Sequence, residues 1–396
     1  MALRTLARSH VSHARLGVLT TKDGVVETPS FVAVATQAAL KAVDLRQVPD
    51  LDCLFVNIYH LLVAGSVDVI SDAGGVRSFM GTEKVIMSDS GGFQVFSLKH
   101  GTVHDELRLP PSLKMSAPRS RRNNNRILRP SDVKVTEEGV TFRSYRDGTR
   151  LFLSPEASVS AQKSISSSII MPLDELPPYH TSSEELASSL DRTNRWMDRS
   201  LETHRRGPQT GQMCYGIVHG GSVPSLRKAS VDFCVSRDFD GFAIGGALGK
   251  DAGELWNIIQ YVMSGARLRE VADRTDRPVH VLGIADPWNI RRLVQLGVDT
   301  FDGCFVTKIS RHGTMLTGDV RNPGRLSIKA GRWKDVHDRL EGCHCPTCSQ
   351  YTLAYIHHLY KARERELVST LVSIHNLTFM TRVMQTIRDD IQRGSL

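Results

Sequence analysis

The sequence predicts an α/β fold, a (β/α)8 or TIM barrel to which a zinc-binding subdomain is appended. Three observations support this prediction. Short, continuously apolar, β-branched runs recur along the chain with helical stretches or loops between them. Acidic residues or glycines directly follow most of these runs. A Cys-x-Cys-x-x-Cys sequence lies near the C-terminus and is followed at a distance by a histidine.

The apolar runs are the predicted strands. Continuous apolar runs are typical of strands buried on both faces of a parallel sheet. Eight such runs with crossovers fit a closed barrel, and a doubly wound open sheet is an alternative that strand count alone does not exclude. The predicted strands are Phe31–Thr36, Leu54–Tyr59, Val85–Ser88, Ser168–Leu173, Tyr215–His219, Gly241–Gly245, Val279–Ile284 and Thr300–Phe305.

The composition is that of a soluble globular protein with a basic surface. Of 396 residues, 40% are hydrophobic and 23% charged, and no apolar run approaches the roughly 20 residues that span a bilayer. The net charge of +8 fits either a solvated surface or a polyanionic partner such as nucleic acid. The seven cysteines form no evident disulfide framework, which indicates a reducing compartment, and we expect a cytoplasmic location.

We expect two domains, the barrel over residues 1–340 and a zinc-binding helical subdomain over 341–396. The barrel domain begins with a hairpin that turns at Asp23-Gly24. It also contains an insertion at 103–153, whose last part, 136–153, reads as a hairpin. The first part, 103–135, is either a solvated loop or an arm for phosphate groups. It contains Arg119, Arg121, Arg122, Arg126 and Arg129.

The cysteine cluster predicts a structural metal site. The thiols of Cys343, Cys345 and Cys348 are too closely spaced to pair with one another, and one would be left over. A fourth soft ligand, His375, completes a tetrahedral Cys3His site for Zn²⁺. Four protein ligands leave no position for water, so the chemistry must lie elsewhere. Residues 349–394 are predicted to be helical, with an apolar face formed by Ile374, Leu377, Met384 and Ile387.

Three aspartates mark a candidate active site. Asp89 and Asp174 each follow a predicted strand, and Asp302 follows Thr300-Phe301 of the last one. The carboxyl ends of barrel strands open onto one face. A single aspartate at such a position is more often a helix cap, but three beside Gly-Gly pairs favour a ligand site. Several carboxylates without a catalytic metal suggest sugar chemistry, in which one carboxylate attacks an anomeric carbon and another transfers protons.

These residues resemble the motifs of the tRNA-guanine transglycosylase (queuine tRNA-ribosyltransferase) family, from about Ser12 to Ile391. The shared motifs are Asp89-Ser-Gly-Gly-Phe-Gln, Asn57-Ile-Tyr-His-Leu, Phe242-Ala-Ile-Gly-Gly, Phe301-Asp302 and the Cys3His site. The resemblance implies a pentosyltransferase that exchanges guanine at the wobble position of tRNA with a G-U-N anticodon for queuine, a 7-deazaguanine base. It also implies a covalent enzyme–RNA intermediate and a homodimer, or a heterodimer with a paralogous subunit.

The resemblance implies a role for individual residues. Asp302 matches the nucleophile and Asp89 the general acid/base, whereas Asp174 matches the carboxylate that reads the purine N–H edge. Phe93 matches the stacking aromatic, and the Gly246 N–H meets the purine carbonyl. Further substrate contacts are implied for Asn57, His219 and Gly283, contacts with tRNA phosphates for Lys308 and Arg311, and zinc binding for Cys343, Cys345, Cys348 and His375.

Some positions depart from the family pattern. His219 stands where many bacterial members have glutamine, while Ala285 and Val306 replace a usual glycine and proline, which suggests reshaped loops. Gly249 replaces a bulkier side chain of members that take the aminomethyl precursor, preQ1. We therefore expect room for the cyclopentenediol of queuine there, and Asp251, near a usual glutamate, also weakens the precursor alternative.

Three other functions remain as alternatives. The family includes a non-catalytic subunit that binds tRNA and dimerises, but loss of the pocket acids is expected in such a protein. An archaeal branch modifies another tRNA position and carries an extra C-terminal domain. A zinc-dependent hydrolase on the same barrel needs metal ligands at strand ends, where this sequence offers mostly Asp and Gly.

Overall fold

The computed structural model describes residues 3–100, 133–207 and 210–396. The arginines of the basic stretch, from Arg119 to Arg129, lie outside these residues, so the proposed phosphate arm stays a prediction. In the three described stretches, no helix combines the length and the apolar character that a bilayer span requires.

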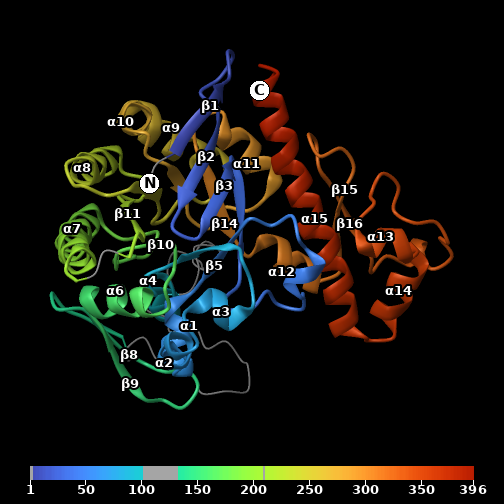
Figure 1. The fold of residues 1–396 in the computed structure, drawn as a ribbon, viewed down its shortest axis with the longest axis horizontal. Helices are drawn as coiled ribbons and strands as arrows, with labels where there is room; N and C mark the ends of the chain where they lie inside the picture. Colours follow the sequence, from blue (N-terminus) through green and yellow to red (C-terminus); the bar gives the residue numbers. More distant parts are fainter. Residues whose placement is uncertain (1–2, 101–132, 208–209) are drawn as a thin grey trace. The chain divides into compact units, whose positions relative to one another are not determined.

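Eight parallel strands close into a barrel (Figure 1), which confirms the predicted fold and removes the open-sheet alternative. Their order is β10-β11-β12-β13-β14-β4-β5-β6, and Ile169 of β10 pairs with Met87 of β6 to close the ring. The strands are β4 (Ser30–Val34), β5 (Cys53–Val56), β6 (Val85–Ser88), β10 (Ile169–Ile170), β11 (Met213–Val218), β12 (Gly241–Ile244), β13 (Val279–Val281) and β14 (Thr300–Gly303).

The continuous apolar runs became strands because both of their faces are covered. Every residue of β5, β6, β11, β12 and β14 is buried, as expected for parallel strands between a barrel interior and surrounding helices. The helices are α1 (Ile58–Ala64), α2 (Val67–Asp72), α3 (Val76–Met80), α4 (Gly92–His100), α6 (Pro155–Ser164), α7 (Ser183–Arg205), α8 (Pro224–Val235), α9 (Ala252–Gln260), α10 (Leu268–Thr275), α11 (Pro287–Val294) and α12 (Phe305–Arg311), with short turns η1 (Leu45–Gln47) and η4 (Tyr261–Gly265).

Seven of the eight predicted strands extend too far at their carboxyl ends, and Phe31–Thr36, Tyr215–His219 and Gly241–Gly245 do so by one or two residues. Leu54–Tyr59 ends at Val56 because α1 begins at Ile58, and Thr300–Phe305 ends at Gly303 because Phe305 begins α12. Val279–Ile284 ends at Val281, before the positive φ of Gly283.

The predicted strand Ser168–Leu173 is reduced to the two residues of β10 by a side chain. The amide of Gln162 on α6 donates to the Met171 carbonyl at 2.8 Å and accepts from the Met171 N–H at 3.0 Å. The Gln162 side chain therefore replaces a neighbouring strand as the hydrogen-bond partner of Met171. The sequence of the strand itself does not predict this contact.

The helices begin where the sequence supplies capping side chains. Ser154 caps α6 and Ser182 caps α7, and Asp286 caps α11 by accepting from the Asn289 N–H at 2.9 Å. Proline occupies the first turn of α6, α8 and α11, where a missing N–H leaves no bond unmade. Each cap stabilises its helix by about 1 kcal/mol. Because a cap involves only residues that are close in the sequence, the starts of these helices can be predicted from the sequence.

Two small antiparallel sheets accompany the barrel. The N-terminal sheet has the order β1 (Leu3–Arg8), β2 (Arg15–Thr21), β3 (Gly24–Thr28), so the predicted turn at Asp23-Gly24 joins its last two strands. The second sheet comprises β7 (Lys134–Val135), β8 (Val140–Arg143) and β9 (Arg150–Leu153), and β8 pairs with β9 as the hairpin expected within residues 136–153.

The chain divides into two compact units, which we describe separately. Unit 1 comprises Met1–Leu3, Thr20–Gly24 and Val56–His280, and unit 2 comprises Arg4–Leu19, Val25–Phe55 and Val281–Leu396. The proposed division into domains 1–340 and 341–396 stays a prediction.

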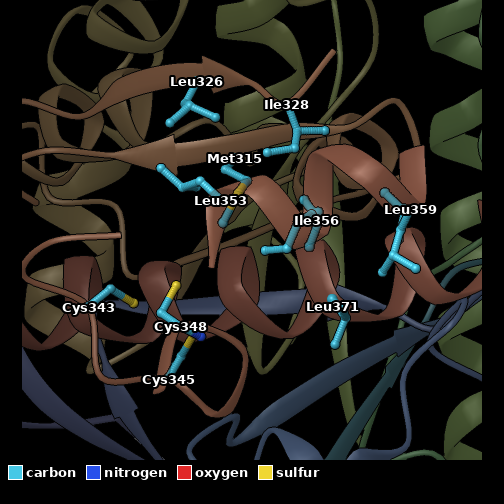
Figure 2. Close-up of a cluster of buried hydrophobic side chains, with 12 residues drawn as sticks. Met315, Leu326, Ile328, Cys343, Cys345, Cys348, Leu353, Ile356, Leu359 and Leu371 are labelled. Carbon is cyan, nitrogen blue, oxygen red and sulfur yellow. The ribbon is translucent and has the colours of Figure 1, made fainter. Parts of the chain in front are cut away.

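The C-terminal part of unit 2 packs around its longest helix, α15 (Arg365–Gln392). β15 (Thr314–Thr317), α13 (Pro346–Gln350) and α14 (Leu353–Lys361) contact α15 (Figure 1). β16 (Gly324–Ser327) pairs with β15, and η5 (Gly331–Trp333) contacts α14. Their apolar side chains form one buried cluster together with the three cysteines (Figure 2). The sequence predicted one apolar face for this helix. The structure shows more burial than that, because every residue from 371 to 377 is buried.

Candidate active site and metal site

Asp89 lies directly after β6 and is surrounded by hydrogen-bond donors of unit 1. Its Oδ1 accepts from the backbone N–H groups of Ile58 at 2.9 Å and Gly91 at 3.1 Å. Its Oδ2 accepts from the amides of Asn57 at 2.5 Å and Gln94 at 2.9 Å. Four donors from two segments, 57–58 and 91–94, therefore hold the carboxyl group in one orientation.

This environment moves the titration of Asp89 toward neutral pH. Burial disfavours the charged form and raises the pKa of Asp89 from 3.8 to about 6, although the hydrogen bonds from Asn57, Gln94, Ile58 and Gly91 oppose the shift. A carboxyl group with such a pKa exists in both protonation states near neutrality. It can therefore donate a proton in one step and accept one in another.

Asp174 and His219 form a second polar pair in unit 1. Asp174 follows β10 and is 5% exposed, and its Oδ1 accepts from the Ser90 hydroxyl at 3.1 Å. Its Oδ2 lies 3.0 Å from Nε2 of His219, which follows β11, but the two groups lack the alignment of a hydrogen bond. Because Ser90 is the residue after Asp89, one short loop links the two carboxylates.

Glycines bring the backbone close to these carboxylates. A Cβ at Gly92 would lie 2.7 Å from the Asp174 carbonyl oxygen, so only glycine fits there. Gly246 follows β12 with a φ of +78°, and a Cβ on it would lie 3.0 Å from Nδ1 of His219. Phe93, the first aromatic of α4, is 55% exposed and so is free to contact a ligand.

Two cavities adjoin this group of residues. One of about 50 Å³ is lined by His219, Gly220, Gly221, Gly246 and Tyr179 among others. A second of about 370 Å³ is lined by Phe96, Glu175, Pro177, Pro178 and Arg192 among others. The smaller cavity includes predicted substrate residues, whereas the larger one contains none of them.

Asp302 belongs to unit 2, where it is the third residue of β14 and is 7% exposed. Its Oδ1 accepts from the Gly283 N–H at 2.9 Å. Gly283 has a φ of +77°, which favours glycine, so its conformation aims the N–H at the carboxylate. The predicted nucleophile and Gly283 are thus brought together within one unit.

The replacement of a usual glycine by Ala285 is accommodated at this site. The Ala285 side chain is 2% exposed and lies against Gly303, where a Cβ would come within 2.7 Å of the Ala285 Cβ. Val306 is fully buried in the first turn of α12. On the same helix Lys308 is exposed and Arg311 half-buried, with its guanidinium donating to the Thr307 carbonyl at 3.0 Å.

The side chains of Cys343, Cys345, Cys348 and His375 form a compact cluster that could hold a metal ion. Their candidate ligand atoms lie within 4.8 Å of one another, and all four residues are buried. Nδ1 of His375 lies 3.4, 3.6 and 3.2 Å from the three sulfur atoms in chain order. These separations suit the edges of a tetrahedron around zinc, whose bonds to sulfur and nitrogen are about 2.3 and 2.1 Å.

The other ring nitrogen of His375 supports this arrangement. Nε2 lies 2.7 Å from the Leu316 carbonyl on β15 and donates to it, so that Nδ1 is left as the ligand atom. The neighbouring Asn376 accepts from the Leu316 N–H at 2.7 Å and fixes the same strand against α15. The donor set, its burial and this supporting hydrogen bond all fit a closed Cys3His site.

The structure contradicts the expectation of open space at Gly249. This residue has a φ of +96°, and a Cβ on it would lie 2.9 Å from the Glu254 Cβ. Glu254 is held there because it accepts from the Tyr179 hydroxyl at 2.7 Å and from the Lys250 N–H at 2.8 Å. Asp251 is the cap of α9, bonded to the N–H groups of Gly253 and Glu254.

Three residues of the site were not assigned from the sequence. Gln94 and Ser90 stand in the Asp89 motif, so their contacts could have been anticipated from proximity alone. Arg227 lies in the first turn of α8, where the helix dipole disfavours a cation. This unusual position is the only feature of the sequence that points to Arg227. Its buried position between two loops required the structure.

Comparisons with known proteins show the family of this chain. Residues 10–110 and 123–396 match the family model described as queuine tRNA-ribosyltransferase. A queuine tRNA-ribosyltransferase of Protochlamydia amoebophila is 43% identical over 97% of this chain and 94% of its own length. The protein of that name from Chlamydia pneumoniae is 40% identical over the full length of both chains, and one from Chlamydia caviae is 41% identical over 99% of each. The chain therefore belongs to the queuine tRNA-ribosyltransferase family.

Proposed function

We propose that this chain is a pentosyltransferase that exchanges guanine at the wobble position of tRNA for queuine. The observation that carries the proposal is the set of carboxylates at the ends of parallel barrel strands, with Asp89 poised to titrate near neutral pH. Membership of the family supports tRNA as the polynucleotide and a 7-deazaguanine as the incoming base. Because Asp89, Asp174 and Asp302 are all present, the active enzyme is favoured over the non-catalytic subunit.

The proposed reaction is a double displacement. The Asp302 carboxylate attacks C1′ of the ribose, the C1′–N9 bond breaks, and its electron pair leaves with guanine. The incoming base then attacks C1′ from the other side and releases Asp302. Two inversions give net retention, as in other retaining glycosyl transfers.

We assign proton transfer at the base to Asp89, and its pKa gives the pH dependence. Guanine release needs the protonated carboxyl group, whose population falls from most molecules below pH 6 to about one in ten at pH 7. The single-turnover rate of guanine release should therefore fall as pH rises through about 6. Base incorporation needs the carboxylate and should rise over the same window.

Asp89→Asn should remove both pH limbs and slow exchange by about 10²-fold or more. Rapid-quench measurements from pH 5 to 8 would follow the release of labelled guanine and the uptake of labelled base, and so give the pH dependence of each step separately. A variant that keeps the wild-type limbs would show that another group titrates.

We assign recognition of the purine N–H edge to Asp174, supported by Ser90 and His219. Asp174→Ala leaves the purine donors unpaired, so guanine binding should weaken by about 2 kcal/mol, roughly thirtyfold. The adjacent acid gives a matched control, since Glu175 instead pairs with Arg192 and Glu175→Gln should leave guanine affinity nearly unchanged. Equal guanine Michaelis constants in the wild type and Asp174→Ala would exclude this role.

The direct test of the proposed function is incorporation of labelled guanine into tRNA with a G-U-N anticodon by the purified chain. A tRNA whose wobble guanosine is replaced serves as the control and should accept no label. Competition by queuine and by preQ1 then decides between the two bases. The experiment is needed because the space next to Gly249 is filled by Glu254, so this position does not favour either base. Failure to label the first tRNA would overturn the proposal.

We further propose that the Cys3His cluster binds Zn²⁺, which would cross-link α13 and α15 and take no part in the reaction. With four protein ligands the ion has no open position, so it supplies stability and not Lewis acidity. The convergence of three buried sulfur atoms and one ring nitrogen within 4.8 Å supports this role, because zinc binds cysteines as thiolates and would neutralise their charge in this apolar cluster.

We propose a dimer, with a second copy or a paralogous subunit, and a cytoplasmic location. For the dimer, a candidate contact is the aromatic pair on the C-terminal part, where the rings of Tyr351 and Tyr355 stack at 5.3 Å and Tyr355 is 39% exposed. All seven cysteines are free, which suits a reducing compartment. Lys308 and Arg311 remain the proposed contacts for tRNA phosphates.

A further inference from the structure

Arg227 is a buried cation without an acidic partner. It lies in the first turn of α8 and is 1% exposed, and among the described residues no carboxylate pairs with it. Burial lowers the pKa of its guanidinium to about 9, and the helix dipole at an N-terminus also disfavours a positive charge. Such an arrangement persists only where other contacts offset its cost.

Those contacts are four backbone carbonyls from two loops. At the end of β11 and in the loop after it, the guanidinium donates to the carbonyls of Val218 at 3.0 Å from Nη1 and of Gly221 at 2.8 Å from Nε. After β12, it donates to Gly245 at 2.8 Å from Nη1 and to Ala247 at 3.0 Å from Nη2. One side chain thus ties together the loop that carries His219 and the loop that carries Gly246.

The bond to Gly245 also sets the direction of a neighbouring donor. The Gly245 carbonyl and the Gly246 N–H belong to one planar trans peptide, in which the two groups point in opposite directions. Because the carbonyl points at Arg227, the Gly246 N–H points away from it. Within the described part of the chain nothing accepts a hydrogen bond from that N–H, and Gly246 is partly exposed.

We propose that Arg227 is a positioning residue for base recognition. By holding four carbonyls, it aims the Gly246 N–H at the purine carbonyl and fixes the His219 loop beside it. The inference rests on the proposed function, because it assumes that Gly246 meets the base. It adds a residue that touches neither base nor ribose and acts through the two loops.

Only a guanidinium makes these four bonds from one plane. Nε, Nη1 and Nη2 face different carbonyls in a rigid fork, whereas a lysine ammonium has three donors around one atom and a shorter reach. Arg227→Lys therefore keeps the charge but should release at least one loop. Loss of one well-oriented hydrogen bond to the base corresponds to about tenfold in affinity.

The experiment compares Michaelis constants for guanine and for tRNA in Arg227→Lys and Arg227→Ala. We expect the constant for guanine to rise about tenfold in each variant, and the constant for tRNA to stay within about twofold. Millimolar guanidinium, far below denaturing concentrations, should partly restore the guanine constant of Arg227→Ala, and equal sodium chloride should not. Lys228→Met is the matched control, since Lys228 is the next residue on α8, is exposed and pairs with Asp232.

Several outcomes would overturn the proposal. Among them are an unchanged guanine constant in a folded variant and parallel rises in both constants. Failure of both variants to fold, even with guanidinium, would make Arg227 a folding residue only. An inactive wild-type chain would instead refute the proposed function, so the two failures can be told apart.

Discussion

Asp302→Asn should abolish guanine exchange and the covalent enzyme–RNA adduct. The amide can still accept the hydrogen bond from the Gly283 N–H, so the fold around β14 should survive. The amide is a far weaker nucleophile than the carboxylate, and loss of a covalent nucleophile lowers turnover by at least about 10³-fold. Incubation with tRNA followed by a denaturing gel would report the adduct as a shifted band.

Asp319→Asn is the matched control, because Asp319 is an exposed aspartate of the same unit. It should form the adduct at the wild-type rate, and Asp302→Ala should behave like Asp302→Asn. A persistent adduct in both Asp302 variants would show that another group attacks the ribose.

Cys348→Ser should remove the metal and unfold the C-terminal part of the chain. The serine hydroxyl is a poor ligand, and structural zinc contributes about 10–16 kcal/mol of apparent binding energy in small zinc domains, which is coupled to folding. The sulfur atom lies 3.2 Å from His375 Nδ1, so the loss disconnects α13 from α15. Metal analysis by mass spectrometry and thermal unfolding by circular dichroism would measure both effects.

The control for this experiment is Cys304→Ser, since Cys304 is exposed and lies outside the cluster. It should retain about one zinc ion per chain and the wild-type melting temperature. If Cys348→Ser instead bound stoichiometric zinc and melted like the wild type, the cluster would not be the metal site.

Much of the barrel could be predicted because its strands are short and buried on both faces. Val85–Ser88 was predicted to the residue, since four consecutive apolar or small residues lie between a polar turn and Asp89. The prediction was wrong where a side chain decided the boundary. Gln162 ends β10 by bonding the backbone of Met171, and such a contact leaves no trace in the periodicity of the strand itself.

In the candidate site, too, some features could be predicted from the sequence and others could not. The positions of Asp89, Asp174 and Asp302 follow from the strand ends, and the spacing of Cys343, Cys345 and Cys348 already indicates a metal site. The crowding of Gly249 by Glu254 was not predictable, because a missing side chain in the sequence says nothing about which neighbour fills the space.

The sequence by itself determined the barrel class, the three closely spaced cysteines of a candidate metal site and the acids near the strand ends, because these depend on local periodicity and short spacings. Only the tertiary structure decided that four donors surround Asp89, that burial raises its pKa to about 6, and that Arg227 holds two loops through their carbonyls. The physical reason is that desolvation and hydrogen-bond direction depend on groups brought together by packing. Residues such as Asn57 and Asp89 are far apart in the chain, and their contact exists only once the strands are assembled.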